Sequence, residues 1–254
     1  MPARPSPFAA IALVALVAAA GHAQTVGVVG VLGDGIYRWD ASEAARGAAV
    51  PSMSFENPAS REQTREIAVD PAGLATRPRF QREPGEQAGE GGRARVEIDI
   101  APGTSLYGTG QAAGPLLRNG RVTECWNTDA YGYQDDAPSL YTSHPWVLAV
   151  RADGTAFGVL ADTTYRCEID LRDGIVFRAD GPEFPVIVIE GASPQEVMVG
   201  LGSLMGTIAM PPRWAIGYHQ CRYSYNPESR VREVAQGFRD RNIPADVIWM
   251  DIDY

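Results

Sequence analysis

Residues 211–254 carry the pattern of a strand, a helix and a second strand, and this pattern sets the tightest limit on the fold. Trp214 to Tyr218 is an apolar run that predicts the first strand. Val247 to Met250 is a continuous apolar run, typical of a strand buried on both faces in a parallel sheet. A β-α-β crossover of this length is the repeat of a barrel or of a doubly wound sheet. One repeat cannot bury its own strands, so we expect this unit to be the front of a longer domain.

The helix between these two strands has its own signals. Asn226 is placed to cap it, and Pro227 suits the first helical position. Apolar side chains recur at helical spacing and predict one apolar face, and Asn242 and Pro244 are expected to end the helix. The apolar positions are Val231, Val234, Ala235 and Phe238.

The middle of the chain has a different period. Ala94 to Ile100 alternates polar and apolar residues, as expected of a strand with one wet and one buried face. Asp153-Gly154 and Asp173-Gly174 are two-residue hairpin signals between apolar runs. Short strands at this spacing favour an antiparallel β-sandwich. The other predicted strands are Pro145–Arg151, Thr155–Leu160, Tyr165–Leu171 and Phe184–Glu190.

A helix is predicted between the sandwich and the β-α-β unit. Ser193 can cap it, Pro194 takes the first helical position and Glu196 completes a capping box. We expect this helix to run to about Leu204.

Charge and composition exclude several classes of function. The 254 residues hold 31 acidic against 22 basic side chains, a formal net charge of −9. Tight, sequence-independent binding to nucleic acid or to an anionic membrane is therefore not expected. Every basic side chain is arginine, so mechanisms that need a P-loop lysine or a Schiff-base amine are excluded.

The first 23 residues resemble an export signal. Arg4 precedes an apolar run from Phe8 to Ala20, and Gly21-His22-Ala23 is a small-x-small cleavage site. The run is shorter than the roughly 20 apolar residues of a membrane span. We therefore expect an exported protein, periplasmic or extracellular, with no membrane attachment once residues 1–23 are removed.

The three cysteines define neither a metal site nor a disulfide. Cys125, Cys167 and Cys221 have no zinc-type spacing, so no metal or other cofactor is predicted. In an exported protein two of them could pair and leave one over, but separate buried thiols fit the sequence equally well. No disulfide is assigned.

Polar residues follow the two predicted strands of the C-terminal unit. Asp251 and Asp253 come at the carboxyl end of the second strand, where β/α folds bind ligands, and alternation puts both side chains on one side. Helix capping or a turn is the alternative role. His219 to Tyr225 follows the first strand and offers aromatic and hydrogen-bonding groups suited to a sugar ring, although His219 could be purely structural.

A further polar, aromatic stretch interrupts the sandwich pattern. Cys125 to Tyr133 reads CWNTDAYGY and lacks strand periodicity. A long loop of this composition on a rigid scaffold is a candidate for binding, and a solvated surface loop is the alternative.

Several of these segments resemble glycoside hydrolase family 31, the α-glucosidase family. Residues 211–225, PPRWAIGYHQCRYSY, and 243–254, IPADVIWMDIDY, look like the opening of its catalytic barrel. Residues 106–110, LYGTG, and 126–129, WNTD, resemble its preceding galactose-mutarotase-like β-sandwich. The likeness runs from about residue 94 to residue 254. It implies a β-sandwich over 24–210 and the first β-α-β unit of a (β/α)8 TIM barrel over 211–254.

The resemblance also implies roles for four residues. Asp251 matches the aspartate that binds the non-reducing sugar, and Ile252 matches its neighbour lining that pocket. Tyr223 matches an aromatic residue beside the same sugar. Asp129 matches an acid on the sandwich loop that reaches towards the next sugar, and this match is weaker because such loops vary. A carboxylate accepts charge-assisted hydrogen bonds from sugar hydroxyls, which suits these roles.

The activity implied is that of a retaining α-glycosidase acting on an oligosaccharide or glycoside. Such enzymes use an aspartate nucleophile and an aspartate acid/base, and both matching motifs would fall after Tyr254. We therefore expect the 254 residues to be an N-terminal part of the enzyme, to contain no catalytic carboxylate and to be inactive alone. A non-catalytic carbohydrate-binding sandwich is the alternative function.

Overall fold

The computed structural model describes residues 25–48, 70–84 and 92–252. The chain divides into two compact units, Met1–Gly206 and Thr207–Tyr254, each of which is described by itself. The predicted signal, residues 1–23, lies outside the described residues, and so does Asp253.

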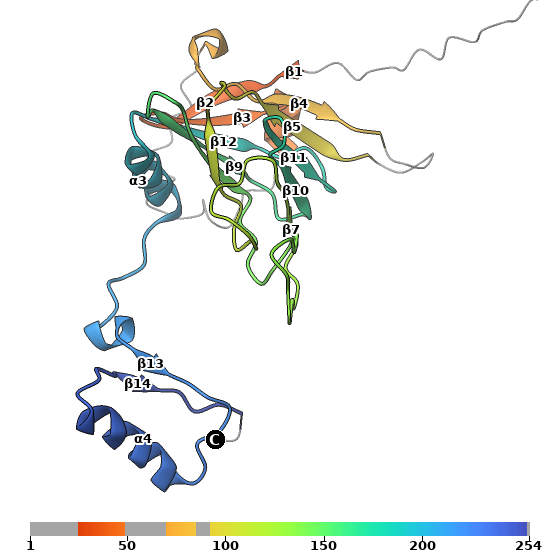
Figure 1. Cartoon of the computed structure of the whole chain (residues 1–254). Helices are drawn as coiled ribbons and strands as arrows, with labels where there is room; N and C mark the ends of the chain where they lie inside the picture. The colour runs from red at the N-terminus through yellow and green to blue at the C-terminus, as the bar shows by residue number, and fades with distance from the viewer. Residues whose placement is uncertain (1–24, 49–69, 85–91, 253–254) are drawn as a thin grey trace, which may run out of the picture. The chain divides into compact units, whose positions relative to one another are not determined.

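The first unit contains two antiparallel sheets of six strands each (Figure 1). The first sheet has the order β1 (Thr25–Val26), β4 (Arg79–Arg82), β5 (Ala94–Ile98), β11 (Ile175–Ala179), β10 (Cys167–Asp170) and β7 (Val122–Cys125). The second has the order β2 (Val28–Gly33), β3 (Ile36–Asp40), β12 (Val186–Gly191), β9 (Ala156–Ala161), β8 (Trp146–Val150) and β6 (Ser105–Gly108). Two short helical segments, α1 (Glu43–Ala48) and η2 (Pro71–Gly73), complete the described part of this unit apart from α3.

The two sheets enclose one apolar core. Trp39, Phe177 and Ile169 are fully buried in it, and both sheets contribute to it. The alternating pattern of Ala94 to Ile98 puts every second side chain into this core, as the sequence predicts. Asp153-Gly154 joins β8 to β9, and Asp173-Gly174 joins β10 to β11. The predicted antiparallel sandwich is confirmed.

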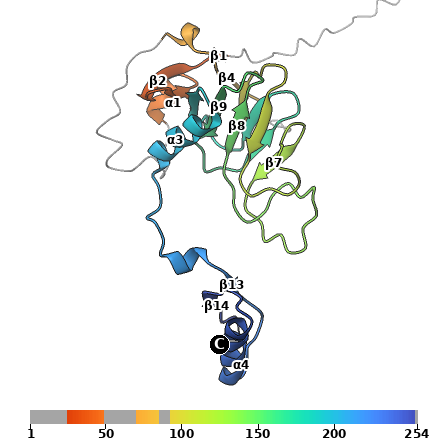
Figure 2. The ribbon, with the colours of Figure 1, turned by 60° about the vertical axis from the view of Figure 1, so that its left-hand side comes forward.

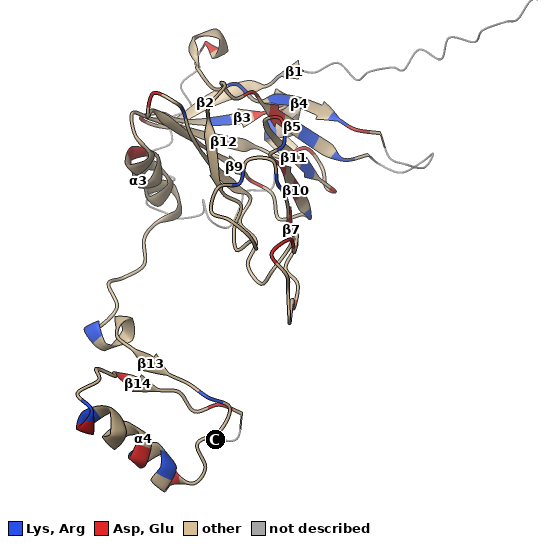
Figure 3. Ribbon diagram, viewed as in Figure 1, with Lys and Arg blue, Asp and Glu red and all other residues tan. Residues whose placement is uncertain are grey.

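The strands of the first sheet carry both arginines and acidic residues (Figure 3), and these form ion pairs on its outer face. Arg95 lies 2.7 Å from Glu97 on the same strand, and Arg178 lies 3.2 Å from Asp170 on the neighbouring strand. Hydrogen bonds from Arg172, and also from Arg178, hold the pKa of the Asp170 carboxyl well below its usual range. The arginines are therefore matched to acids and form no basic patch on this face.

The outer face of the second sheet is covered by α3 (Pro194–Met205), as Figures 1 and 2 show. Val197, Leu201 and Leu204 of this helix pack with Trp146 and Ile189 of the sheet. The predicted cap is confirmed, because the Ser193 hydroxyl accepts a hydrogen bond from the Glu196 N–H at 3.3 Å. The apolar side of the helix thus buries the second face of β8, β9 and β12.

The second unit is a parallel β-α-β unit. β13 (His219–Gln220) pairs in parallel with β14 (Val247–Ile248), and α4 (Glu228–Asp240) connects them. The predicted apolar face of α4 lies towards the sheet at Val231, Val234 and Phe238, which are half-buried, whereas Ala235 is exposed. The rings of Phe238 and Tyr218 are 5.8 Å apart.

Three local predictions in this unit are wrong. Arg213–Ile216 forms a 3-10 helix, η3, so the strand predicted over Trp214–Tyr218 begins only at His219. Asn226 does not cap α4, because Pro227 holds the cap position without a side-chain hydrogen bond. The strand predicted over Val247–Met250 is shorter, because β14 ends at Ile248. Trp249 and Met250, which follow it, are 52% and 50% exposed, as expected of a single repeat that cannot bury its own strands.

Candidate functional site

Two loops leave the same edge of the parallel sheet in the second unit. Residues 221–227 follow β13, and residues 249–252 follow β14. Because parallel strands end at the same edge, Tyr223 on the first loop and Asp251 and Ile252 on the second belong to one side of this unit. The structure therefore brings three of the four predicted substrate-binding residues to one sheet edge.

Hydrogen bonds tie these two loops together at their bases. The Trp249 backbone N–H donates to the Gln220 carbonyl at 2.9 Å, and its indole N–H donates to Nδ1 of His219 at 3.0 Å. The Gln220 amide donates to the Tyr225 hydroxyl at 2.9 Å. His219 thus orients Trp249 within the unit. The sequence left open whether His219 binds a sugar or is structural, and this contact favours the structural role.

The side chains proposed to meet a sugar are accessible. Asp251 is half-buried, and its Oδ1 accepts a hydrogen bond from the Ile252 N–H at 2.8 Å. That bond fixes the orientation of the carboxylate and engages only one of its oxygens. Tyr223 is 64% exposed and Ile252 is 72% exposed, so an aromatic face and an aliphatic side chain lie open on the same edge.

The fourth predicted residue, Asp129, lies on a long loop of the sandwich unit. This loop connects β7 to β8 and contains no strand, as the sequence predicts. Its two limbs are bonded to each other, since the Thr128 N–H donates to the Leu140 carbonyl at 2.8 Å and the Ser139 hydroxyl donates to the Trp126 carbonyl. Asp129 is exposed immediately beyond this bonded base. The loop is therefore braced at its base, and the acid lies next to this braced part.

Aromatic side chains gather on and beside this loop. Trp126, Tyr131 and Tyr133 are 54%, 96% and 53% exposed. A hollow of about 460 Å³ opens at the base of the loop, where Trp126 and Tyr165 both line it. Sequence reasoning missed Tyr165, because it belongs to the β9–β10 connection and no local pattern links it to the loop. Exposed aromatic faces next to hydroxyl and amide groups suit carbohydrate.

A buried arginine braces the segment that precedes β7. Arg118 is 5% exposed and donates to the carbonyls of Ala113 at 2.8 Å and Pro115 at 3.2 Å. It also donates to the Thr123 hydroxyl at 3.0 Å. Burial lowers the pKa of its guanidinium. Arg118 was not predicted from the sequence, where it is one arginine among 22.

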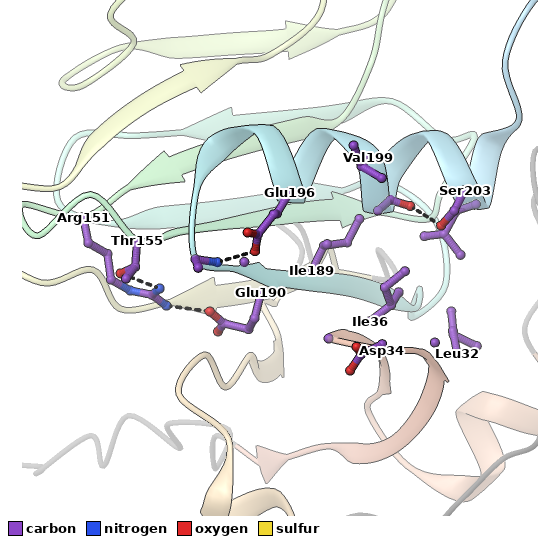
Figure 4. A pocket seen from close by; sticks show the side chains of 16 residues that line it. Leu32, Asp34, Ile36, Arg151, Thr155, Ile189, Glu190, Glu196, Val199 and Ser203 are labelled. Carbon is purple, nitrogen blue, oxygen red and sulfur yellow. Dashed lines mark hydrogen bonds and ion pairs between the residues drawn. The ribbon is translucent and has the colours of Figure 1, made fainter.

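A cavity of the sandwich unit lies between α3 and the β2–β3 turn (Figure 4). Its volume is about 790 Å³. Three of its charged lining residues form bonds within the fold: Arg151 donates to Glu190 at 2.9 Å, and the Glu196 carboxylate accepts from the Ala192 N–H at 2.9 Å. These contacts brace the start of α3 and the end of β12, so this cavity is a structural feature.

Metal-binding and membrane-spanning features were sought in the same residues. Within residues 25–48, 70–84 and 92–252, no group of three His, Cys, Asp or Glu side chains is placed to hold a metal ion. In those same ranges no helix combines the length and the apolar character that crossing a membrane requires.

The comparison with known families decides the assignment. The glycosyl hydrolase 31 N-terminal galactose mutarotase-like domain matches residues 32–170, more than half of the chain. The chain belongs to glycosyl hydrolase family 31. The TIM-barrel domain of the same family matches residues 208–254. The predicted family and the predicted fold class, a mutarotase-like sandwich followed by the start of a barrel, are confirmed.

Curated relatives of this family 31 chain include α-glucosidases. It is 41% identical over 153 residues to alpha-glucosidase 2 of Bacillus thermoamyloliquefaciens, covering 59% of this chain and 19% of that protein. It is 32% identical over 158 residues to the lysosomal alpha-glucosidase of Mus musculus, covering 60% and 16%. The chain thus spans about a fifth of the length of such relatives.

Solved structures of the family resemble the chain as well. A family 31 alpha-glucosidase from Bacteroides thetaiotaomicron is 50% identical, with a TM-score of 0.57, over 63% of this chain and 28% of that one. A Flavobacterium johnsoniae dextranase complexed with glucose is 23% identical, with a TM-score of 0.69, over 88% and 31%. At that identity the second likeness shows the fold alone.

Proposed function

We propose that this chain is the N-terminal part of a retaining α-glycosidase that hydrolyses O-glycosyl bonds in α-glucoside-type carbohydrate. The observation that carries the proposal is the placement of Asp251 on the loop that follows β14 in a parallel β-α-β unit of a family 31 chain. Ligands of β/α barrels bind at that edge. The names of the relatives, alpha-glucosidases in both a bacterium and a mouse, support the same substrate class.

Three residues of the second unit would hold the non-reducing sugar. The Asp251 carboxylate would accept hydrogen bonds from its hydroxyls, which are charge-assisted and reject an analogue lacking the hydroxyl. Tyr223 would pack an aromatic face beside the ring, and Ile252 would line the pocket with its aliphatic side chain. The hydrogen bond from the Ile252 N–H supports this role for Asp251, because it fixes the carboxylate before a sugar arrives.

The sandwich unit would also contact the carbohydrate. Asp129 would accept hydrogen bonds from sugar hydroxyls beside the braced base of its loop, and Trp126 would offer an aromatic face at that base. The nucleophile and the acid/base would come from barrel segments outside the 254 residues. The protein would be exported through the signal at residues 1–23, act on oligosaccharides or glycosides and need no cofactor.

The experiment that tests this proposal assays the full-length protein on an aryl α-glucoside beside the matching α-xyloside and α-galactoside. Turnover of one of the three, with retention of the anomeric configuration, supports the proposal and names the sugar. Absence of turnover together with retained binding of an oligosaccharide would instead favour a non-catalytic sugar-binding sandwich.

Asp251 provides the residue-level test. Asp251→Ala in the full-length protein should lower kcat/KM roughly 10²–10³-fold, because a charged hydrogen bond is lost in the pocket. This factor corresponds to several kcal/mol of transition-state binding. Asp251→Asn keeps the shape and removes the charge, and should also lower kcat/KM. Asp173→Asn, at the exposed β10–β11 turn, is the matched control and should leave kcat/KM unchanged. Wild-type kcat/KM for Asp251→Ala would remove Asp251 from the proposed site.

A further inference from the structure

The structure brings two of the three cysteines together. Cys125 on β7 and Cys167 on β10 are direct partners in the antiparallel register of these two strands. Both side chains are buried, at 6% and 0% exposure, and both belong to the core between the sheets. Cys221 is exposed and belongs to the other unit. The sequence could not distinguish these three residues, whereas the sheet register singles out one pair.

The backbone geometry of this pair suits a disulfide. Hydrogen-bonded positions alternate along an antiparallel pair, and the Leu171 N–H donates across it to the Arg121 carbonyl at 2.8 Å. From this pair, hydrogen-bonded positions recur at every second residue along β7 and β10. Cys125 and Cys167 therefore occupy a hydrogen-bonded position, where the Cα atoms are about 5.5 Å apart. Disulfides span Cα separations of about 4.4–6.8 Å, and opposite residues point to the same face.

Closing the bond requires a small movement that β7 can make. The Cβ atoms of opposite residues are about 4.5–5.5 Å apart, whereas a disulfide brings them to about 3.5–4.5 Å. β7 is the edge strand of its sheet and pairs only with β10. An approach of about 1 Å therefore disturbs no other strand pair of β7.

We propose that Cys125 and Cys167 form a cross-strand disulfide when the protein folds in an oxidising compartment. Its occurrence in the cell rests on the proposed export, which supplies the oxidant. In the reaction a disulfide oxidant, R–S–S–R, is reduced to two thiols, and the two cysteine thiols are oxidised to one S–S bond. Both thiol protons pass to the two sulfurs released from the oxidant.

The proposed bond would hold the ends of the loop that carries Asp129. Cys125 immediately precedes the loop that carries Asp129, and the backbone N–H of His144, at the far end of this loop, donates to the Cys125 sulfur. A bond from Cys125 to Cys167 would fasten both ends of the loop to β10, the strand next to β7. It would close a covalent loop of about 40 residues, which restricts the unfolded chain.

Burial decides when the bond can form. It raises the pKa of the Cys125 thiol to about 11 and raises the pKa of Cys167 as well, so little thiolate exists in the folded protein. Exchange needs a thiolate and access for the oxidant. The bond therefore forms during folding, and the folded core then shields it from reductants.

The test is disulfide mapping of the full-length protein after export into an oxidising compartment. The protein is alkylated in denaturant without reduction, digested and analysed by mass spectrometry. A peptide linking Cys125 to Cys167, two hydrogens lighter than the sum of its parts, supports the proposal. Alkylation of both residues without prior reduction, or a link from either one to Cys221, overturns it. A Cys221→Ala variant is the matched control and should give the same linked peptide.

A stability measurement complements the map. A reductant present during unfolding should lower the Tm of the wild type by roughly 5 °C, and should not change the Tm of the Cys125→Ala/Cys167→Ala double variant. An equal response of both proteins would overturn the proposal. Hydrolysis of an aryl α-glucoside by the same sample tests the enzymatic function separately, since an active protein with two free thiols contradicts only the disulfide.

Discussion

Gly158 offers a sharp test of how the sandwich is packed. It lies on β9 between Leu148 of β8 and Ile189 of β12. A Cβ added there would lie 1.9 Å from the far end of the Trp146 indole ring. Trp146 is 4% exposed and belongs to the cluster that packs α3 against the second sheet. Glycine at this position is therefore required by the ring that covers it.

The expected cost of Gly158→Ala follows from that distance. Ordinary contact begins near 3.4 Å, so the indole must move by about 1.5 Å in a close-packed cluster. Overpacking of this kind costs up to about 3 kcal/mol, and the reduced freedom of the unfolded chain returns about 0.7 kcal/mol. We expect the free energy of unfolding to fall by about 2 kcal/mol, measured by urea titration followed by circular dichroism.

Two further variants isolate the steric cause. Gly73→Ala is the matched control, because nothing lies within 4 Å of its added Cβ, and we expect it to be neutral or slightly stabilising. Trp146→Phe makes room, so combining it with Gly158→Ala should recover part of the loss in a double-mutant cycle. If Gly158→Ala unfolds within about 0.5 kcal/mol of the wild type, the packing argument is refuted.

Two other predictions concern Arg118 and His144 of the sandwich unit. Arg118→Met should lower the free energy of unfolding by about 3 kcal/mol in a urea titration, because three acceptors lose a charged donor. Arg121 is more exposed, so Arg121→Met should lower the free energy of unfolding by less than about 1 kcal/mol. Equal losses in the two variants would contradict the bracing role of Arg118. Burial lowers the pKa of His144 below 6.5, so the unfolded chain takes up a proton that the folded chain resists. The contribution of His144 to the free energy of unfolding should be constant above about pH 6.5 and should fall as the pH drops below it. The urea midpoint should therefore fall more between about pH 7 and about pH 5 in the wild type than in His144→Gln. An equal change in the two proteins would contradict this prediction.

Local patterns predicted much of the fold. The alternation of Ala94 to Ile98, the Asp-Gly turns and the Ser193 cap depend on residues near one another in sequence, and each is found in the structure. Trp214 to Ile216 is the contrary case, because its apolar run gives no period to separate a strand from the 3-10 helix that forms.

In the candidate site, too, some residues could be predicted from the sequence and others could not. The order of Tyr223, Asp251 and Ile252 after two strands is readable from the sequence, and the parallel pairing of β13 and β14 places them at one edge. Tyr165 was not predicted, because it lines the hollow with Trp126, which belongs to a distant part of the chain. Arg118 was not predicted either, because its three acceptors lie within five residues of it but form no strand or helix period that would mark them. The functions of the four predicted residues stay predictions until the variants are measured.

The sequence by itself determined the class of the protein: an antiparallel sandwich, a parallel β-α-β start and the residue types at the ends of its strands. Those properties follow from side-chain period, turn residues and caps, which act over a few positions. Only the tertiary structure decided which distant residues meet. Strand order and register set Cys125 opposite Cys167 and Trp146 over Gly158, because hydrogen bonding between strands fixes partners that no local pattern encodes.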